Sequence, residues 1–424
     1  MTSSKQARSS RLLAVVLSLT AVAAVSGCGA FDTPKARPCA WLERQAEPAD
    51  SSTRQQTVVL VDRSSSTRPD TNTSPGHQSP DWAATLLDPQ QMTLPALEGG
   101  ILSMAGFDGN RSTVDWAVSS TFVTPVKGNE TRRKDQQRAR SECLKERLRQ
   151  LAAEEPGTDR TDVLGALAAA SDRLGTEGGR RRIYVATDGL TNTGCADLRS
   201  SGFDGTAEIK ATVERCRKTG ELPDLKGTEV HLVGIGQPAR GDKPSSAQTA
   251  WLIALWTRLC EATGASPCKV TAITHDDETG HTTGTGKPEP AVTFPALSER
   301  SADRVTTIVL PGSILFATDR AELSQDARDT LDKAARRIKE LDPVSVTVSG
   351  HTDSRGSEQH GRQLSRARAQ AVRKALAQRG ITVISARGYS DDRPRCTPEY
   401  HDGVPDYAAM ACNRRVEIAV TVRR

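Results

Sequence analysis

An aspartate and an arginine lie fifteen positions apart, at 353 and 368, with types and spacing that indicate chemistry. Asp353 follows the alternating segment 344–349, which has the period of a half-buried strand. We expect a helix to begin near Leu364, and Arg368 falls on the side of it that faces the core. An unpaired charge buried on that side costs free energy. Two interpretations stay open: a structural ion pair that fixes the turn, or a grip on a zwitterion, with a carboxylate on Arg368 and an ammonium on Asp353.

The elements that must position this pair can be placed from apolar periodicity. Strands are expected at 305–310, 314–316, 344–349, 381–386 and 413–422. A helix is expected at 325–341, with Leu331, Ala335, Ile338 and Leu341 on its core side. This order predicts an α+β sandwich with two helices on one face of a sheet.

Four motifs in this region occur in a recognisable order: GHTDSRG at 350–356, LSRARAQAV at 364–372, GYSDDRP at 388–394 and NRRVEIAV at 413–420. Together they resemble the OmpA-like C-terminal domain, over residues 304–424. The resemblance implies non-covalent binding to the peptide stem of peptidoglycan, with Asp353 and Arg368 gripping diaminopimelate and Thr352 beside them. One departure is that His360-Gly361 stands where the family usually has an asparagine.

A second set of polar residues follows a different group of strands. The apolar run at 57–61 and candidate strands at 101–107, 112–123, 182–186 and 229–235 alternate with helical stretches at 132–153, 162–174 and 248–262. This alternation predicts an α/β fold with a mostly parallel sheet and helices on both faces.

Ligands of such sheets bind beyond the carboxyl ends of the strands. The polar residues at strand or helix ends there are Asp62, Ser64, Ser66, Thr161 and Asp188. Two carboxylates and three hydroxyls are hard oxygen ligands that suit a Mg²⁺ ion. Taken singly, each residue also has a plain structural role, such as Thr161 as a helix N-cap.

These five residues resemble the metal-ion-dependent adhesion site of von Willebrand factor A (vWA) domains, through DxSxS at 62–66, the threonine at 161 and TDG at 187–189. The resemblance implies a bound Mg²⁺ whose open position accepts a carboxylate from a protein partner.

The first 27 residues are expected to be a removable leader. Lys5, Arg8 and Arg11 precede an apolar run that ends in VSGC at 25–28, which resembles a lipobox. We therefore expect acylation of Cys28 and anchoring on the extracytoplasmic side of the cell membrane, or of an outer membrane if the envelope has one. The alternative is an ordinary secretory signal with Cys28 in a disulfide.

Eight cysteines remain after Cys28, an even set that suits an oxidising compartment. They allow about 105 pairings, so connectivity cannot be derived. Nearness in sequence favours Cys396–Cys412 and Cys260–Cys268, which leaves Cys195–Cys216 and Cys39–Cys143.

These signals divide the chain into a leader (1–27), a tether (28–55), a vWA-like domain (56–275), a linker (276–303) and an OmpA-like domain (304–424). The linker is rich in Gly, Thr and Pro and is expected to be semi-flexible.

Without the leader the formal net charge falls to about +2, which argues against a nucleic-acid partner. The basic stretch 132–150 also holds Glu142 and Glu146, which favours a solvated outer face over a polyanion-binding one. The sequence has no H-E-x-x-H, G-x-S-x-G or C-x-x-C motif, so an enzyme is disfavoured. We expect a lipid-anchored peptidoglycan-binding protein that presents a metal-dependent adhesion domain. The alternative is an envelope scaffold whose main ligand is a protein held at the metal site.

Overall fold

The computed structural model describes residues 39–43, 55–69, 80–88, 99–175, 179–275, 287–325 and 327–423. The expected leader, the candidate lipidation residue Cys28 and most of the tether lie outside these ranges. Among the described helices, none combines the length and apolar character needed to cross a bilayer.

Six strands form the first sheet, in the spatial order β3-β2-β1-β4-β5-β6. Their bounds are Gln56–Asp62 (β1), Gly100–Phe107 (β2), Asp115–Val123 (β3), Arg181–Ala186 (β4), Thr228–Val233 (β5) and Cys268–Val270 (β6). β1, β2, β4, β5 and β6 pair in parallel, and β3 alone runs antiparallel, against β2. The expected mostly parallel α/β sheet is confirmed.

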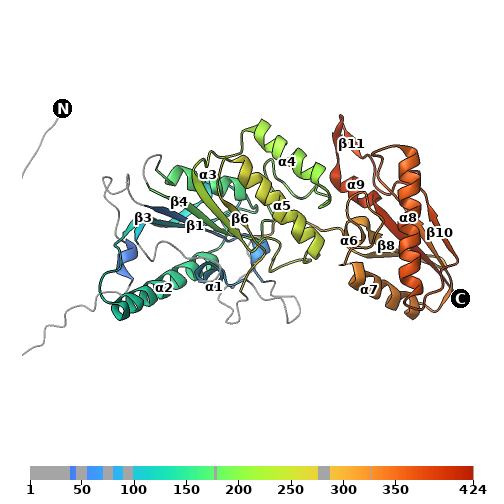
Figure 1. The fold of residues 1–424 in the computed structure, drawn as a ribbon, viewed down its shortest axis with the longest axis horizontal. Helices are drawn as coiled ribbons and strands as arrows, with labels where there is room; N and C mark the ends of the chain where they lie inside the picture. Colours follow the sequence, from blue (N-terminus) through green and yellow to red (C-terminus); the bar gives the residue numbers. More distant parts are fainter. Residues whose placement is uncertain are drawn as a thin grey trace, which may run out of the picture. The chain divides into compact units, whose positions relative to one another are not determined.

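Helices cover both faces of this sheet (Figure 1). α1 (Trp82–Leu87) and α2 (Glu130–Ala153) lie on one face, and α3 (Val163–Arg173), α4 (Thr206–Thr219) and α5 (Ser246–Ala262) lie on the other. Alternate residues of β1 serve the two cores: Val59 and Val61 pack with α1 and α2, whereas Val58 and Leu60 pack with α3 and α5. Burial on both faces explains why β1 is an unbroken apolar run.

Short elements complete this region. They are the 3₁₀ helices Ala40–Glu43 (η1), Ser65–Thr67 (η3) and Arg111–Thr113 (η5). The sequence did not predict α1, α4 or β6. α1 has six residues and β6 three, and α4 buries a mixed set of Glu208, Ile209, Thr212 and Cys216 that gives no apolar stripe.

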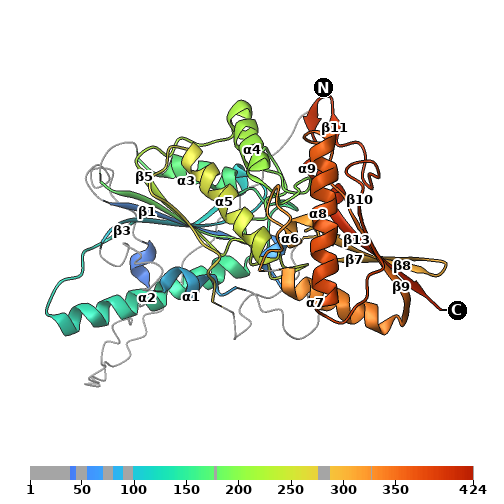
Figure 2. The same cartoon turned by 45° about the vertical axis from the view of Figure 1, so that its right-hand side comes forward.

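The second sheet has five strands in the order β10-β9-β13-β8-β7. They span Ser298–Ala302 (β7), Val305–Pro311 (β8), Pro343–Gly350 (β9), Ser385–Gly388 (β10) and Arg415–Val422 (β13). α7 (Ala327–Glu340) and α8 (Glu358–Ala377) pack together against this sheet (Figure 2). All four residues expected on the core side of α7 belong to or pack against this core, as the α+β arrangement requires.

Four expected elements differ in extent or type. The strand expected at 381–386 is shifted, because β10 spans Ser385–Gly388, whereas Ile381 and Val383, which gave the apolar signal, are buried in the core before the strand begins. Residues expected as a strand at 314–316 belong largely to a helical turn, α6 (Gly312–Leu315). β7 lies within the segment expected to be linker. α8 begins at Glu358 rather than near Leu364, because Ser357 caps it by accepting a hydrogen bond from the His360 N–H. Its first turn is polar, so apolar periodicity could not reveal it. The remaining elements are β11 (Tyr400–His401), β12 (Val404–Pro405) and α9 (Tyr407–Asn413).

Four disulfides join the eight described cysteines, and they are the four pairs favoured by sequence nearness and elimination. Cys39–Cys143 fixes the end of the tether to α2 across a separation of 104 residues. The part of the tether around η1 is therefore attached to the folded chain.

His351 is buried at the end of β9 with no hydrogen-bond partner on either ring nitrogen among the described residues. Its ring stacks on Tyr389 at a centroid distance of 5.6 Å. Burial, followed by the positive charge of Arg415, lowers the pKa of His351 to about 4, although the Glu417 carboxylate lies 3.9 Å away. The imidazole is consequently neutral in the folded protein near pH 7.

Removing the long-range disulfide with the double substitution Cys39→Ala/Cys143→Ala should lower the free energy of unfolding more than Cys260→Ala/Cys268→Ala does. Loop-closure entropy predicts losses of about 4–5 and about 2–3 kcal/mol respectively, because the closed loops differ so much in length. Chemical denaturation of both variants and the wild type measures the difference. Equal losses would contradict this account.

His351→Phe should flatten the acid side of the stability profile. Below the ordinary histidine pKa of about 6.5, the unfolded chain takes up a proton that the folded chain refuses. The wild type should therefore lose stability as the pH falls from about 6.5 towards about 4, whereas the phenylalanine variant lacks this loss. Thermal unfolding at pH 7.5 and pH 5 tests the sign, and parallel curves for the two proteins would rule it out.

Candidate ligand and metal sites

The first candidate site is the turn that follows β9. Gly350 ends the strand where α8 comes closest, since a Cβ at this position would lie 2.1 Å from the carbonyl oxygen of Ser365. Thr352 and Asp353 follow and are 7% and 6% exposed. Close packing of the helix on the strand end therefore places Arg368, inside α8, in the same buried region as Asp353.

Asp353 does not pair with Arg368. Its carboxylate accepts hydrogen bonds from the guanidinium groups of Arg355, at 2.7 Å, and of Arg414, at 2.5 Å. Burial acts to raise the pKa of Asp353, but these two arginines outweigh it and hold that pKa below its ordinary value. The interpretation of 353 and 368 as a structural ion pair is therefore wrong, because other arginines neutralise the aspartate.

Arg368 is 4% exposed, and its guanidinium lies over the Phe316 ring, 5.0 Å from the centroid. Its Nε donates to the carbonyl oxygen of Arg320 at 2.8 Å. Among the described residues its two terminal nitrogens donate no hydrogen bond and it forms no ion pair. Burial lowers its pKa, as expected for a cation held away from water. Arg368 is thus an oriented cation that lacks an anion.

Arg414 is a component of this site that the motif at 413–420 does not single out. It follows α9 and bridges two carboxylates, Asp353 through Nη1 and Asp204 through Nε, the latter at 2.9 Å. The Thr318 hydroxyl also donates to Asp204, at 3.1 Å. The motif NRR marked the position, but the sequence did not show that its first arginine turns towards Asp353.

The departure at His360-Gly361 has a steric reason in this fold. A Cβ on Gly361 would lie 2.2 Å from the Ser390 hydroxyl and 3.2 Å from that of Thr352. The backbone N–H of Thr352 donates to the carbonyl oxygen of Ser390, which fixes these two residues together. The space that an asparagine side chain would use is filled by Ser390, so position 361 cannot contribute a side-chain contact.

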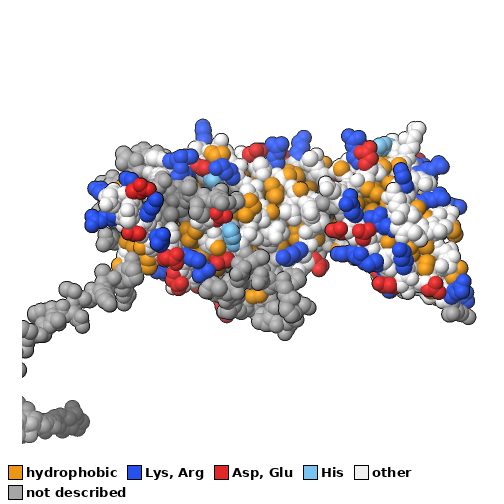
Figure 3. All heavy atoms as spheres, turned by 60° about the horizontal axis from the view of Figure 1, so that its bottom comes forward, with side chains coloured by type: hydrophobic (Ala, Val, Ile, Leu, Met, Phe, Trp, Pro, Cys, Tyr) orange, Lys and Arg blue, Asp and Glu red, His pale blue; other side chains and the backbone are white. Residues whose placement is uncertain are grey.

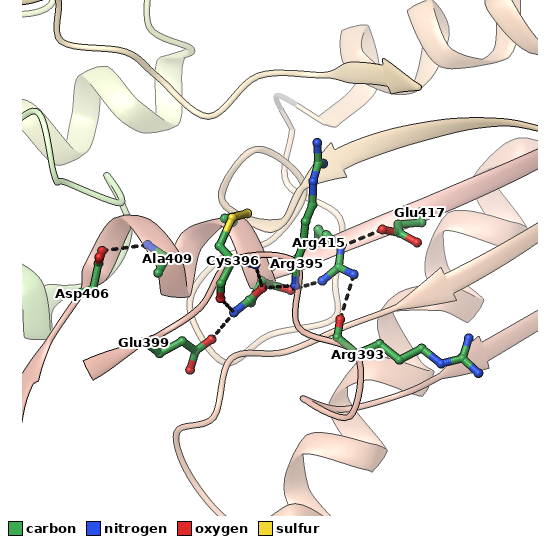
Figure 4. The surroundings of a disulfide bond; sticks show 10 residues. Arg393, Arg395, Cys396, Glu399, Asp406, Ala409, Arg415 and Glu417 are labelled. Carbon is green, nitrogen blue, oxygen red and sulfur yellow. Dashed lines mark hydrogen bonds and ion pairs between the residues drawn. A yellow bond between two sulfur atoms is a disulfide. The ribbon is translucent and has the colours of Figure 1, made fainter. Parts of the chain in front are cut away.

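A polar loop supports the turn from the side of the Cys396–Cys412 disulfide (Figure 4). The Asn413 side chain accepts from the backbone N–H groups of Arg395 and Cys396 and donates to Glu399 at 2.6 Å. Glu399 in turn accepts from the backbone N–H of Ser354, next to Asp353, at 2.8 Å. The disulfide loop is thereby hydrogen-bonded to the turn that follows β9.

The second candidate site lies at the carboxyl end of the first sheet. The strand order reverses between β1 and β4, and in open α/β sheets this switch point forms the ligand crevice. Asp62 ends β1 and Asp188 follows β4. The topology therefore brings together residues 126 positions apart in the sequence.

The five residues expected to bind metal are gathered here. The Ser64 N–H donates to Asp62 at 2.9 Å, and the Ser64 and Ser66 hydroxyls are 3.1 Å apart. The Thr161 N–H donates to the side chain of Asn192, on the loop that follows Asp188. Asp162, not Thr161, caps α3, which leaves the Thr161 hydroxyl for the site.

Asp62 and Asp188 are 1% and 0% exposed, and Asp188 Oδ2 has no hydrogen-bond partner among the described residues. Burial first, and the Asp62 charge second, raise the pKa of Asp188 to about 8; burial likewise raises that of Asp62. An unpartnered buried carboxylate oxygen next to a second carboxylate and three hydroxyls fits a hard divalent cation. Such an ion would be held by Asp62, Ser64, Ser66, Thr161 and Asp188.

One further carboxylate reaches this site from the segment expected to be linker. Glu289 accepts from the Ser66 backbone N–H at 2.9 Å and from the Thr161 hydroxyl at 3.2 Å. Its surrounding sequence, KPEPA, has no feature that distinguishes it from a linker. Among the described residues no three His, Cys, Asp or Glu side chains are already gathered as a metal-binding group. A cation here would thus depend on hydroxyl ligands as well as carboxylates.

The exposed face of α2 carries acidic as well as basic side chains. Glu142 and Glu146 are exposed, and Lys134 pairs with Glu130 one turn away. On the face shown in Figure 3, basic and acidic side chains are interspersed. This agrees with the interpretation of α2 as a solvated outer helix.

Comparison with known proteins bears on the C-terminal region. The OmpA family matches residues 315–399. Outer membrane protein A of Klebsiella aerogenes is 35% identical over 137 residues, which is 30% of this chain and 39% of that protein. Photosystem I P700 chlorophyll a apoprotein A2 of Gloeobacter violaceus is 30% identical over 145 residues, 31% of this chain but only 17% of that protein.

The chain therefore spans less than two thirds of these relatives. Among solved structures, the cell wall anchor of the T6SS from Pseudomonas aeruginosa matches 30% of this chain and 88% of its own, with 28% identity and a TM-score of 0.26. The OmpA family match covers the turn at Asp353 and the helix that carries Arg368. From these matches, the C-terminal part of this chain is an OmpA-like domain.

Proposed function

We propose that the protein is a non-enzymatic binding protein of the cell envelope that attaches to peptidoglycan through its OmpA-like domain. The observation that carries this proposal is Arg368, a buried and oriented guanidinium without an anion. A buried cation of this kind is stabilised by a ligand carboxylate, and a bidentate contact would add selectivity.

Diaminopimelate in a peptide stem offers the complementary charges. Its side-chain carboxylate would bind Arg368, and its ammonium would approach Asp353, next to the Thr352 hydroxyl. Arg355 and Arg414 already hold the Asp353 carboxylate ionised and in place, so the ligand would meet a formed site.

We further propose that Cys28 is acylated and anchors the chain to a membrane, which the VSGC motif supports. Mass spectrometry of the mature N-terminus distinguishes an acylated Cys28 from a free one. A membrane anchor and a wall-binding domain in one chain would tie the two layers together.

A second function is favoured by the convergence of five oxygen-bearing residues at the switch point of the first sheet. We propose that this vWA-like site holds Mg²⁺ and binds an acidic group of a protein partner. Bound Mg²⁺ would neutralise the buried carboxylates and present an open coordination position. In that case the wall-binding domain would position the partner-binding one.

Asp353→Asn and Arg368→Gln should each weaken binding to purified peptidoglycan sacculi by about tenfold or more, as expected when a charged hydrogen bond is lost. Co-sedimentation of the whole chain without its leader measures this. Asp391→Asn and Arg373→Gln, at exposed positions of the same domain, are matched controls that should bind as the wild type does. Failure of the wild type to sediment, or equal binding by all variants, would refute the wall-binding proposal.

Mg²⁺ should raise the melting temperature of the wild type. At a concentration one hundred times the Kd, binding to the folded state should raise the free energy of unfolding by about 2.7 kcal/mol. Asp188→Asn should abolish this gain because it removes a charged ligand, whereas the exposed control Asp242→Asn should retain it. Differential scanning calorimetry with EDTA and with Mg²⁺ measures both states. An undiminished Mg²⁺ effect in Asp188→Asn would place the ion elsewhere.

A further inference from the structure

The segment 287–294 runs across the vWA-like site and is attached to it at several points. The carbonyl oxygen of Lys287 accepts from the Ser65 hydroxyl, and the Lys287 ammonium donates to the carbonyl oxygen of Gly157 at 2.6 Å. On the other side of Glu289, the carbonyl oxygen of Pro290 accepts from the Asn192 side chain at 3.1 Å. Phe294 is 7% exposed in the core.

These contacts hold Glu289, a half-buried residue, over the hydroxyls expected to bind metal. Its two carboxylate oxygens accept from the Ser66 N–H and the Thr161 hydroxyl. Burial, and then the negative charge of Asp62, raise its pKa to about 7. Asp188 also feels the Glu289 charge, so the three carboxylates share one environment.

Three carboxylates in one poorly hydrated region repel one another unless a cation lies among them. The buried Oδ2 atom of Asp188, which has no hydrogen-bond partner among the described residues, is a second observation that fits a cation at this position. Because the Thr161 hydroxyl already contacts Glu289, an ion that binds Thr161 would have Glu289 as its neighbour.

We propose that Glu289 is this chain's own carboxylate ligand to a divalent cation at the vWA-like site, and that an acidic partner must displace it. The inference rests on the metal site proposed above and deepens it. The partner's acidic side chain would compete with a carboxylate that is always present at high effective concentration. Binding of the partner would then release the segment that leads to the OmpA-like domain.

Mn²⁺ serves as the probe, with the whole chain lacking its leader. Electron paramagnetic resonance of free Mn²⁺ gives the affinity, and water-proton relaxation reports exchanging waters on the bound ion. Glu289→Ala should bind Mn²⁺ at least about fivefold more weakly, since affinity falls with ligand charge. It should also show higher relaxivity, because water replaces the carboxylate. The exposed Glu142→Ala control should match the wild type.

Asp62→Ala separates the two proposals. If Asp62→Ala loses Mn²⁺ binding while Glu289→Ala keeps both the affinity and the relaxivity of the wild type, Glu289 is no ligand and the inference fails, although the metal site stands. If the wild type binds no Mn²⁺, or Asp62→Ala binds it unchanged, the metal site itself fails. Glu289→Ala should melt no lower than the wild type in EDTA, because it relieves repulsion; Glu289→Gln repeats the test with the side-chain volume retained.

Acetate tests the displacement step. In Glu289→Ala, acetate can enter the vacated position and should return the relaxivity towards that of the wild type. Acetamide, its neutral analogue, should have no effect. If acetate and acetamide act alike, the position does not select a carboxylate and the proposed competition is wrong.

Discussion

Both candidate sites depend on the high free-energy cost of an ionised group that is buried without an opposite charge. At the carboxyl end of the first sheet, burial and mutual repulsion oppose ionisation of Asp62, Asp188 and Glu289 and raise their pKa values. At the turn after β9 the excess charge is positive, on Arg368, since Asp353 is already neutralised by Arg355 and Arg414. Each site therefore calls for a ligand of defined sign, a cation in one and a carboxylate in the other.

The backbone geometry of the fold places these ionisable groups in buried or half-buried positions. Parallel pairing of β1 with β4 places the ends of both strands, and with them Asp62 and Asp188, at one edge of the sheet. In the C-terminal domain, α8 packs closely on Gly350 at the end of β9, and this contact sets the position of Arg368 relative to the turn. Hydrogen bonds through Asn413 and Glu399 connect the disulfide loop to the backbone of this turn at Ser354. Preorganisation of this kind lowers the entropy that a ligand must lose on binding.

Many of the strands and helices could be predicted from the sequence, because burial of one or both faces of an element requires apolar residues at regular spacing. The continuous apolar run of β1, the alternation of β9 and the Leu331 stripe of α7 each located an element within a few residues. Features without such a trace were missed: the polar first turn of α8, the mixed face of α4 and β7 within a Pro-rich stretch. The partners of Asp353 and the approach of Glu289 depend on tertiary contacts between distant residues, and no local pattern encodes them.

The central claim is that Arg368 binds a ligand carboxylate, and calorimetric titration with soluble peptide stems tests it most directly. A stem that contains diaminopimelate should bind at least about tenfold more tightly than one with lysine, which has the same ammonium but lacks the side-chain carboxylate. The difference should vanish in Arg368→Gln. Equal affinity of the wild type for the two stems would show that the side-chain carboxylate of diaminopimelate contributes nothing to binding, and this would contradict the proposed role of Arg368.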